Sequence, residues 1–179
     1  VDITGIAASQ LPIALLPFRD ETGAPQSVSG VIQADLERSG LFRFVATPLL
    51  IDETGIPPYP DLRTRGADAL VAGSVAKLVD GRFDVRYKLW DVVKGADLGG
   101  QSLAVPAMDL RLAAHRIADA IYEKLTGEKG VFATRIAYVT KGAGRYTLRV
   151  TDADGEGGQV ALTSPDPIIS PAWSPDGRE

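Results

Sequence analysis

His115 is the only histidine of the chain and the first residue to consider for acid-base chemistry or metal binding. A zinc site around it would need carboxylates alone as its other ligands, which is uncommon, because the sequence contains no cysteine. His115 also lies beside the apolar stripe of its segment rather than on it. We therefore expect a solvated or hydrogen-bonded surface histidine, and neither a metal ligand nor the base of a Ser-His or Cys-His pair.

Acidic side chains at alternate positions, Asp152, Asp154 and Glu156 followed by Gly157, imitate the start of a calcium-binding loop. The imitation fails at the twelfth position of the loop, where a bidentate glutamate is required and Thr163 stands. The flanking segments also have strand patterns instead of the helices that enclose such a loop. We expect a hairpin turn here, with a weak cation site as the alternative.

The tetrad Asp20-Glu21-Thr22-Gly23 recurs as Asp52-Glu53-Thr54-Gly55. Neighbouring acids could share a proton in acid-base chemistry, but adjacent side chains on a strand or turn point apart, and both tetrads end in glycine, which indicates turns. Gly142-Ala143-Gly144 lacks the third glycine of a dinucleotide-binding loop, and no Gly-Lys-Ser or Gly-Lys-Thr phosphate loop is present. The sequence thus predicts no catalytic residue, no cofactor-binding residue, no metal ligand and no enzyme.

The composition indicates a globular protein and disfavours several other classes. An apolar share of 45% over 179 residues is typical of a globular protein with one ordinary domain and part of another. The net charge is -4 and the lysines and arginines form no block, which disfavours binding to nucleic acid or to an anionic membrane surface. No apolar run reaches the roughly eighteen residues of a membrane-spanning helix.

Residues 1–127 carry alternating strand and helix patterns. Apolar residues repeat at helical spacing from Val28 to Leu36, Pro25 suits the first turn of that helix, and Gly40 can close it. Asp80-Gly81 between two strand patterns predicts a hairpin. The predicted order is strand 11–18, helix 25–40, strand 41–45, a polar connection 48–60, strands 69–79, 83–89 and 101–105, and helix 110–125 closed by Gly127. This order predicts an α+β domain, a mixed sheet with its two main helices on one face.

Residues 128–179 differ in character, because short strand patterns with turn signals about every ten residues follow the linker 127–130. The predicted strands are 135–140, 146–151 and 159–163. Three short antiparallel strands are the bulk of one propeller blade. We therefore expect the start of an all-β propeller, one blade and incomplete.

The segment Ser170-Pro171-Ala172-Trp173-Ser174-Pro175-Asp176-Gly177 resembles the repeat signature of TolB-type propellers. In that signature Pro and Asp-Gly set a tight turn, and the tryptophan is a large wedge between blades. The front part of the chain also resembles the amino-terminal domain of the TolB family. The segments that carry this resemblance are Leu15-Leu16-Pro17-Phe18, Leu36 to Phe42, Gly66 to Gly73, Tyr87 to Asp91 and His115 to Asp119.

The resemblance implies a protein of the periplasm of Gram-negative bacteria, with its signal peptide already removed and a six-bladed propeller. It implies binding of the outer-membrane lipoprotein Pal through the propeller and of the inner-membrane protein TolA through an amino-terminal segment, for outer-membrane integrity and cell division. Propellers with this signature also occur in serine peptidases, so the front part of such a peptidase is the alternative. Against it, the chain has no Gly-x-Ser-x-Gly elbow.

Val1, Asp2, Ile3, Thr4 and Gly5 resemble the end of the segment through which the family contacts TolA. Val1 and Ile3 alternate with polar residues, which is a strand pattern without a hairpin partner. Such a segment can add to the edge of a partner's sheet, or it can dock on its own protein. A frayed terminus is the alternative.

Overall fold

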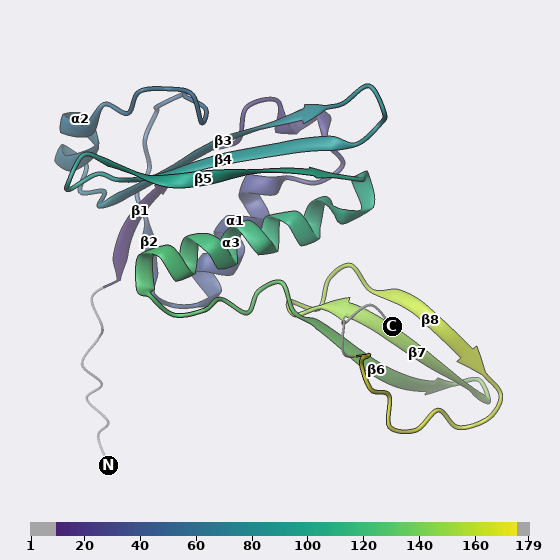
Figure 1. Cartoon of the computed structure of the whole chain (residues 1–179). Helices are drawn as coiled ribbons and strands as arrows, with labels where there is room; N and C mark the ends of the chain where they lie inside the picture. The colour runs from purple at the N-terminus through teal and green to yellow at the C-terminus, as the bar shows by residue number, and fades with distance from the viewer. Residues whose placement is uncertain (1–9, 175–179) are drawn as a thin grey trace, which may run out of the picture. The chain divides into compact units, whose positions relative to one another are not determined.

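The computed structural model describes residues 10–174, and the chain divides into two compact units. One unit ends at Gly130 and the other begins at Val131. Figure 1 shows the helices and strands of both units. The fold is a mixed α+β unit followed by an antiparallel all-β unit, which confirms the predicted class.

The first unit contains five strands, three α-helices and two short 3-10 helices among its described residues. In chain order they are β1 (Leu11–Leu15), η1 (Glu21–Gly23), α1 (Val28–Arg38), β2 (Phe42–Phe44), α2 (Tyr59–Thr64), β3 (Ala69–Lys77), β4 (Phe83–Asp91), β5 (Ala96–Val105), η2 (Ala107–Asp109) and α3 (Leu110–Thr126). The short helix α2 begins at the end of the stretch 48–60, which was predicted as a polar connection, and extends four residues beyond it. It begins at Tyr59 with a proline at its start, and prolines suit this position because their missing N–H has no helical partner there.

The five strands form one sheet in the order β2-β1-β3-β4-β5. β1 runs parallel to β2 and to β3, and β3, β4 and β5 are antiparallel neighbours. The turn at Asp80-Gly81 joins β3 to β4 as predicted, with Gly81 in the left-handed region at φ 86°. The mixed sheet therefore arises because β1 and β2 are joined by a helix, whereas β3 to β5 are joined by hairpins.

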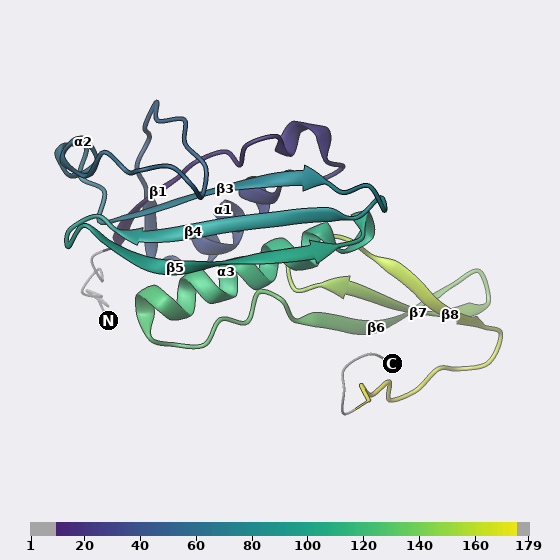
Figure 2. The same cartoon turned by 45° about the horizontal axis from the view of Figure 1, so that its top comes forward.

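α1 and α3 pack together on one face of this sheet, as Figures 1 and 2 show. Their apolar faces are fully buried, and the side chains that share this core are Val28, Val31, Ile32, Leu36, Leu110, Ala114, Ile117, Ala118 and Ile121. Gly127 ends α3 in a left-handed conformation at φ 78°, and Gly40 follows α1 at φ 73°. The predicted helical faces and both predicted glycine ends are confirmed.

The opposite face of the sheet has its own apolar core under α2 and the loop before it. Leu62 of α2 and Trp90 of β4 both belong to this core. The other buried members of this cluster are Ala14, Leu16, Ala67, Leu70, Ala72 and Val92. The two main helices lie on one face as predicted, and the short helix α2, in and after the predicted polar connection, covers part of the second face.

α1 begins at Val28, so Pro25 lies before the helix and not in its first turn. Ser27 is the N-cap, and its hydroxyl accepts from the amide of Gly30 at 3.2 Å. The carboxylate of Glu21 accepts from the amide of Ser29 at 2.9 Å and from its hydroxyl at 2.5 Å. These acceptors satisfy two free amides of the first turn, those of Ser29 and Gly30, and so favour a helix start at this point.

The second unit is a three-stranded antiparallel sheet in the order β6-β7-β8. Its strands are β6 (Arg135–Gly142), β7 (Arg145–Asp152) and β8 (Gln159–Ser164). The turn between β6 and β7 has Ala143 at φ 48° and Gly144 at φ 75°, as a type I′ hairpin requires. Gly142-Ala143-Gly144 is thus a hairpin turn, and the three predicted strands are confirmed.

Candidate functional site

The blade of the second unit exposes apolar side chains on both faces of its sheet. Ile136 and Tyr138 of β6 are 48% and 39% exposed, and on the alternate face Leu162 of β8 is 53% exposed. A sheet that stands alone would normally cover at least one face. Among residues 131–174 nothing covers either face fully, so this sheet has the surface of a repeat that packs between neighbours.

Trp173 lies against one face of this blade. Its ring is 5.8 Å from the guanidinium carbon of Arg135, a cation-π distance, and it remains 40% exposed. Trp173 lines an open groove of about 210 Å³ together with Leu148 and Val150. Ser174 is the last described residue, and Pro175, Asp176 and Gly177 of the predicted repeat motif lie outside the described residues, as does the whole segment Val1–Gly5.

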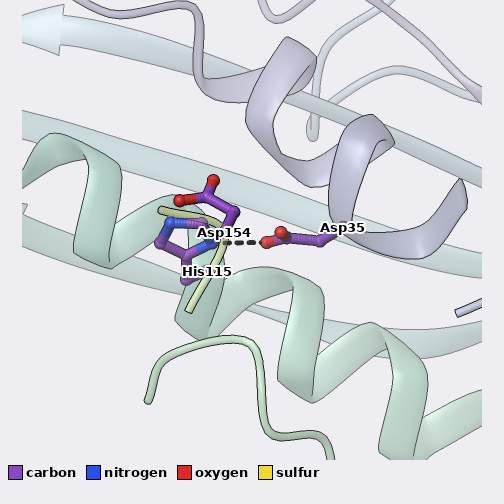
Figure 3. Close-up of side chains that lie close together, drawn as sticks. All are labelled: Asp35, His115 and Asp154. Atoms are coloured by element: carbon purple, nitrogen blue, oxygen red, sulfur yellow. Dashed lines mark hydrogen bonds and ion pairs between the residues drawn. The ribbon is translucent and has the colours of Figure 1, made fainter. Parts of the chain in front are cut away.

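His115 is buried, and the prediction that it is a surface residue is wrong. It is 1% exposed and lies on α3, where its Nδ1 is 2.5 Å from Oδ2 of Asp35 on α1. Figure 3 shows the two side chains pointing toward each other between the helices. Asp35 is also 1% exposed, and its Oδ1 accepts from Nη1 of Arg38 at 3.0 Å.

The sequence held one signal for this pair. Asp35 follows Val31 by four positions and Ile32 by three, so it lies on the apolar stripe of α1 and must be buried with the stripe. A buried carboxylate needs a buried donor, and the single histidine could supply one. Because both side chains are buried and lie within hydrogen-bond distance of each other, the pair joins α1 to α3.

The acidic tetrads are built into turns, as predicted. Glu21 is buried and caps α1, whereas its neighbour Asp20 is exposed and points away. Asp52 accepts from the hydroxyl of Thr54 at 2.6 Å and from its amide at 2.8 Å. These two hydrogen bonds hold the pKa of Asp52 below its ordinary value, and an ion pair with Arg19 lowers it further.

The loop from Asp152 to Gly157 is the hairpin turn between β7 and β8. The amide of Gly155 donates to the carbonyl of Asp152 at 2.9 Å, and the amide of Glu156 donates to Oδ1 of Asp154 at 3.0 Å. Gly155 and Gly157 both have positive φ, at 87° and 67°. These features are those of turn chemistry, so the turn interpretation of the acidic residues is confirmed.

Within residues 10–174 no helix is long and apolar enough to cross a lipid bilayer. Three polar residues that were candidates for chemistry have local structural roles. His115 joins two helices, Glu21 caps one, and Asp52 closes a turn. The blade, with its exposed apolar side chains, is the surface that we consider as a candidate functional site.

Comparisons with known proteins match both units. The TolB amino-terminal domain family matches residues 1–98, and the TolB beta propeller domain family matches residues 122–179. The chain is similar to Tol-Pal system protein TolB of Polaromonas sp. (strain JS666 / ATCC BAA-500), with 59% identity over 180 residues that cover 100% of this chain and 42% of that protein. The similarity to the protein of the same name from Albidiferax ferrireducens is 60% identity over the same shares.

A solved structure has the same fold. The crystal structure of TolB from Acinetobacter baumannii superposes with a TM-score of 0.75 at 37% sequence identity, covering 94% of this chain and 42% of that one. The chain therefore spans well under half the length of the proteins it resembles.

Proposed function

This chain belongs to the TolB family, and on that ground we propose that it is part of a periplasmic scaffold protein of the Tol-Pal system that binds other proteins and catalyses no reaction. In this proposal the protein links a TolA-like inner-membrane protein to a Pal-like outer-membrane lipoprotein, and so serves outer-membrane integrity and cell division. The observation that carries the proposal is the succession of the two TolB domain families along one chain.

The local roles of the polar residues support a function in binding. The buried pair of His115 with Asp35 has no exposed face for a substrate, and the carboxylate of Glu21 is engaged by the first turn of α1. The exposed apolar side chains of the blade, by contrast, are those of a surface that packs on further protein. In the proposal that protein is the rest of a propeller, whose assembled surface binds the Pal-like lipoprotein.

The segment Val1–Gly5 is the proposed contact with the TolA-like partner. Val1 and Ile3 would fill pockets on the partner while the backbone of the segment adds to the edge of its sheet. The small residues that follow, Ala7, Ala8 and Ser9, would leave the segment free to reach the partner. Competition between a docked and a free segment would then couple TolA binding to Pal binding through a free-energy difference.

Deletion of Val1–Gly5 tests this assignment. Calorimetry with the carboxy-terminal domain of TolA should show that the deletion abolishes binding, with the complete mature protein as reference. The thermal midpoint of the first unit should stay nearly unchanged, because β1 begins only at Leu11. Ile3→Ser should weaken binding while Ala8→Ser should not, since only Ile3 belongs to the alternating apolar positions. Unchanged affinity after the deletion would refute the assignment.

A further inference from the structure

β5 is an open edge of the first unit's sheet. It ends the strand order, and among the described residues no strand pairs with its outer side. Figure 2 shows it along the border of the sheet, above α3. With ten residues it is also a long edge, whereas β2 at the opposite edge has three. A long edge presents a row of backbone N–H and C=O groups that can pair with another chain.

β5 carries one of the usual protections of an edge strand, a β-bulge at Leu98, and from Gly100 to Val105 its pairing with β4 is regular. The strand contains no proline, lysine or arginine. Its one charged side chain, Asp97, is engaged by Nζ of Lys88 on β4 at 2.7 Å, on the side of the sheet away from α3. The stretch from Gly99 to Val105 is uncharged. From Gly100 to Val105 the edge therefore has no charge, proline or bulge that would prevent a further strand from pairing with it.

A pocket of about 230 Å³ lies beside this edge, between β5 and the carboxyl-terminal half of α3. Two glycines of β5 line it. Gly99 has φ +100°, and a Cβ built on it meets no atom within 4 Å, whereas a Cβ at Gly100 would lie only 2.1 Å from the carbonyl oxygen of Tyr87. A side chain is thus disfavoured at both positions. The pocket that these glycines line is open to solvent.

The polar groups that line this pocket are hydrogen-bond donors. Lys124 is exposed at its rim and makes no ion pair with another of residues 10–174. Burial raises the pKa of Tyr87, so its hydroxyl stays protonated and able to donate. Gln101 adds a side-chain amide. Donors of this kind around one ammonium group complement a carboxylate.

We propose that the β5 edge binds an extended segment of a partner protein by strand addition, with an Asp or Glu side chain of that segment seated in the pocket beside Lys124. Main-chain hydrogen bonds to β5 provide affinity, and the pocket selects an acidic residue at one alternate position. This surface requires neither Val1–Gly5 nor the blade, so it goes beyond the scaffold function proposed above and stands or falls independently of it.

The test uses the full chain, labelled with nitrogen-15, and a designed nine-residue peptide with both ends capped. Valine and threonine alternate in the peptide around a central glutamate, and a matched peptide has glutamine there. Nuclear magnetic resonance titration to millimolar peptide should shift the amides of β5 and of Lys124, with the glutamate peptide binding about fivefold tighter than its matched peptide, a difference typical of one exposed ion pair.

Charge reversal supplies the control. Lys124→Glu should remove the preference for the glutamate peptide, whereas Lys129→Glu, an equal change at an exposed lysine outside the pocket, should leave it intact. Lys124→Gln serves as the second variant, and melting curves verify the fold of each. Absence of shifts on β5 would overturn the proposal, and so would equal affinity for both peptides. A dimer through β5, seen by analytical ultracentrifugation, would instead assign the edge to a second copy and overturn it too.

Discussion

The pair of His115 and Asp35 connects two helices whose sequence positions are 80 residues apart. Both side chains are buried, so neither can exchange its partner for water. Removing one partner of such a pair leaves a buried polar group or charge uncompensated, which is more costly than replacing both. The stability of the first unit should therefore depend on both partners being present together.

His115→Leu should destabilise the protein by about 3 kcal/mol, at the low end of values for broken buried pairs because Arg38 still engages Asp35. The double variant His115→Leu with Asp35→Leu should cost less than the sum of the two single changes, since no buried charge then remains. Urea unfolding of the four proteins of this cycle measures both quantities. Additive losses would contradict a direct interaction, and Arg116→Ala, on the exposed side of α3, serves as the control.

Asp52 provides a prediction about pH. Its folded pKa is lowered, chiefly by the hydroxyl of Thr54, so its stabilising contribution is complete above the unfolded pKa of about 4 and is lost as the pH falls through the folded pKa. Asp52→Asn should therefore cost about 1 kcal/mol at pH 7, the usual net value of one such hydrogen bond, and much less at pH 3. Asp20→Asn is the matched control, because asparagine tolerates the left-handed backbone of Asp20 (φ 63°). A cost that does not change with pH would contradict the role of the carboxylate.

At the scale of elements, α1 and α3 act as one layer on the sheet. α3 contacts both β4 and β5, and α1 packs along α3. The tilted rings of Phe42 and Tyr122, 6.1 Å apart, extend this layer from α3 to the short edge strand β2. The apolar stripes of the two helices should therefore contribute much of the first unit's stability.

Ile117→Ala tests that expectation at the centre of the layer, where Ile117 is fully buried. The loss should be about 2–5 kcal/mol, the range for truncation of a large core side chain. Thermal or urea unfolding gives the value. Arg116→Ala, one residue away on the exposed side of the same helix, should change stability by less than about 0.5 kcal/mol. Similar losses for the two variants would mean that the face of α3 is wrongly assigned.

At the scale of the whole molecule, the two units differ in how much apolar surface they bury. The first unit has cores on both faces of its sheet, whereas the second leaves Ile136, Leu162 and Trp173 substantially exposed. A repeat of this kind gains its stability from neighbouring repeats. The two units should therefore open with different free energies when this chain is studied alone.

Hydrogen exchange measures that difference. Amides of β6, β7 and β8 should exchange fast, and amides of β3, β4 and α3 should exchange slowly. A longer chain that supplies further blades should slow exchange in β6 to β8 and leave the first unit unchanged, which is the matched comparison. Equal protection of both units in this chain would show that the blade is stable by itself.

Features that depend on neighbouring residues could be predicted from the amino-acid sequence alone. The spacing of apolar residues from Val28 to Leu36 predicted a helix with one buried face, and Asp80-Gly81 predicted a hairpin. Both patterns could be interpreted because each depends only on residues that are close in the sequence. The three strands of the blade followed from regular turn signals in the same way. The TolB resemblance also came from contiguous motifs, and the family comparisons bear it out.

Features that require distant segments to meet depend on the packing of the helices and strands and could not be predicted in this way. His115 looked like a surface residue from its own helix, and it is buried because α1 brings Asp35 to it. The start of α1 depends on Glu21 reaching forward across a loop to Ser29, and the pocket beside β5 forms where α3 lies against the strand. The spacing of residues within one element predicts which of its faces is apolar. Which polar groups on two packed elements become partners, and which edge of the sheet stays open, depends on how the elements pack together.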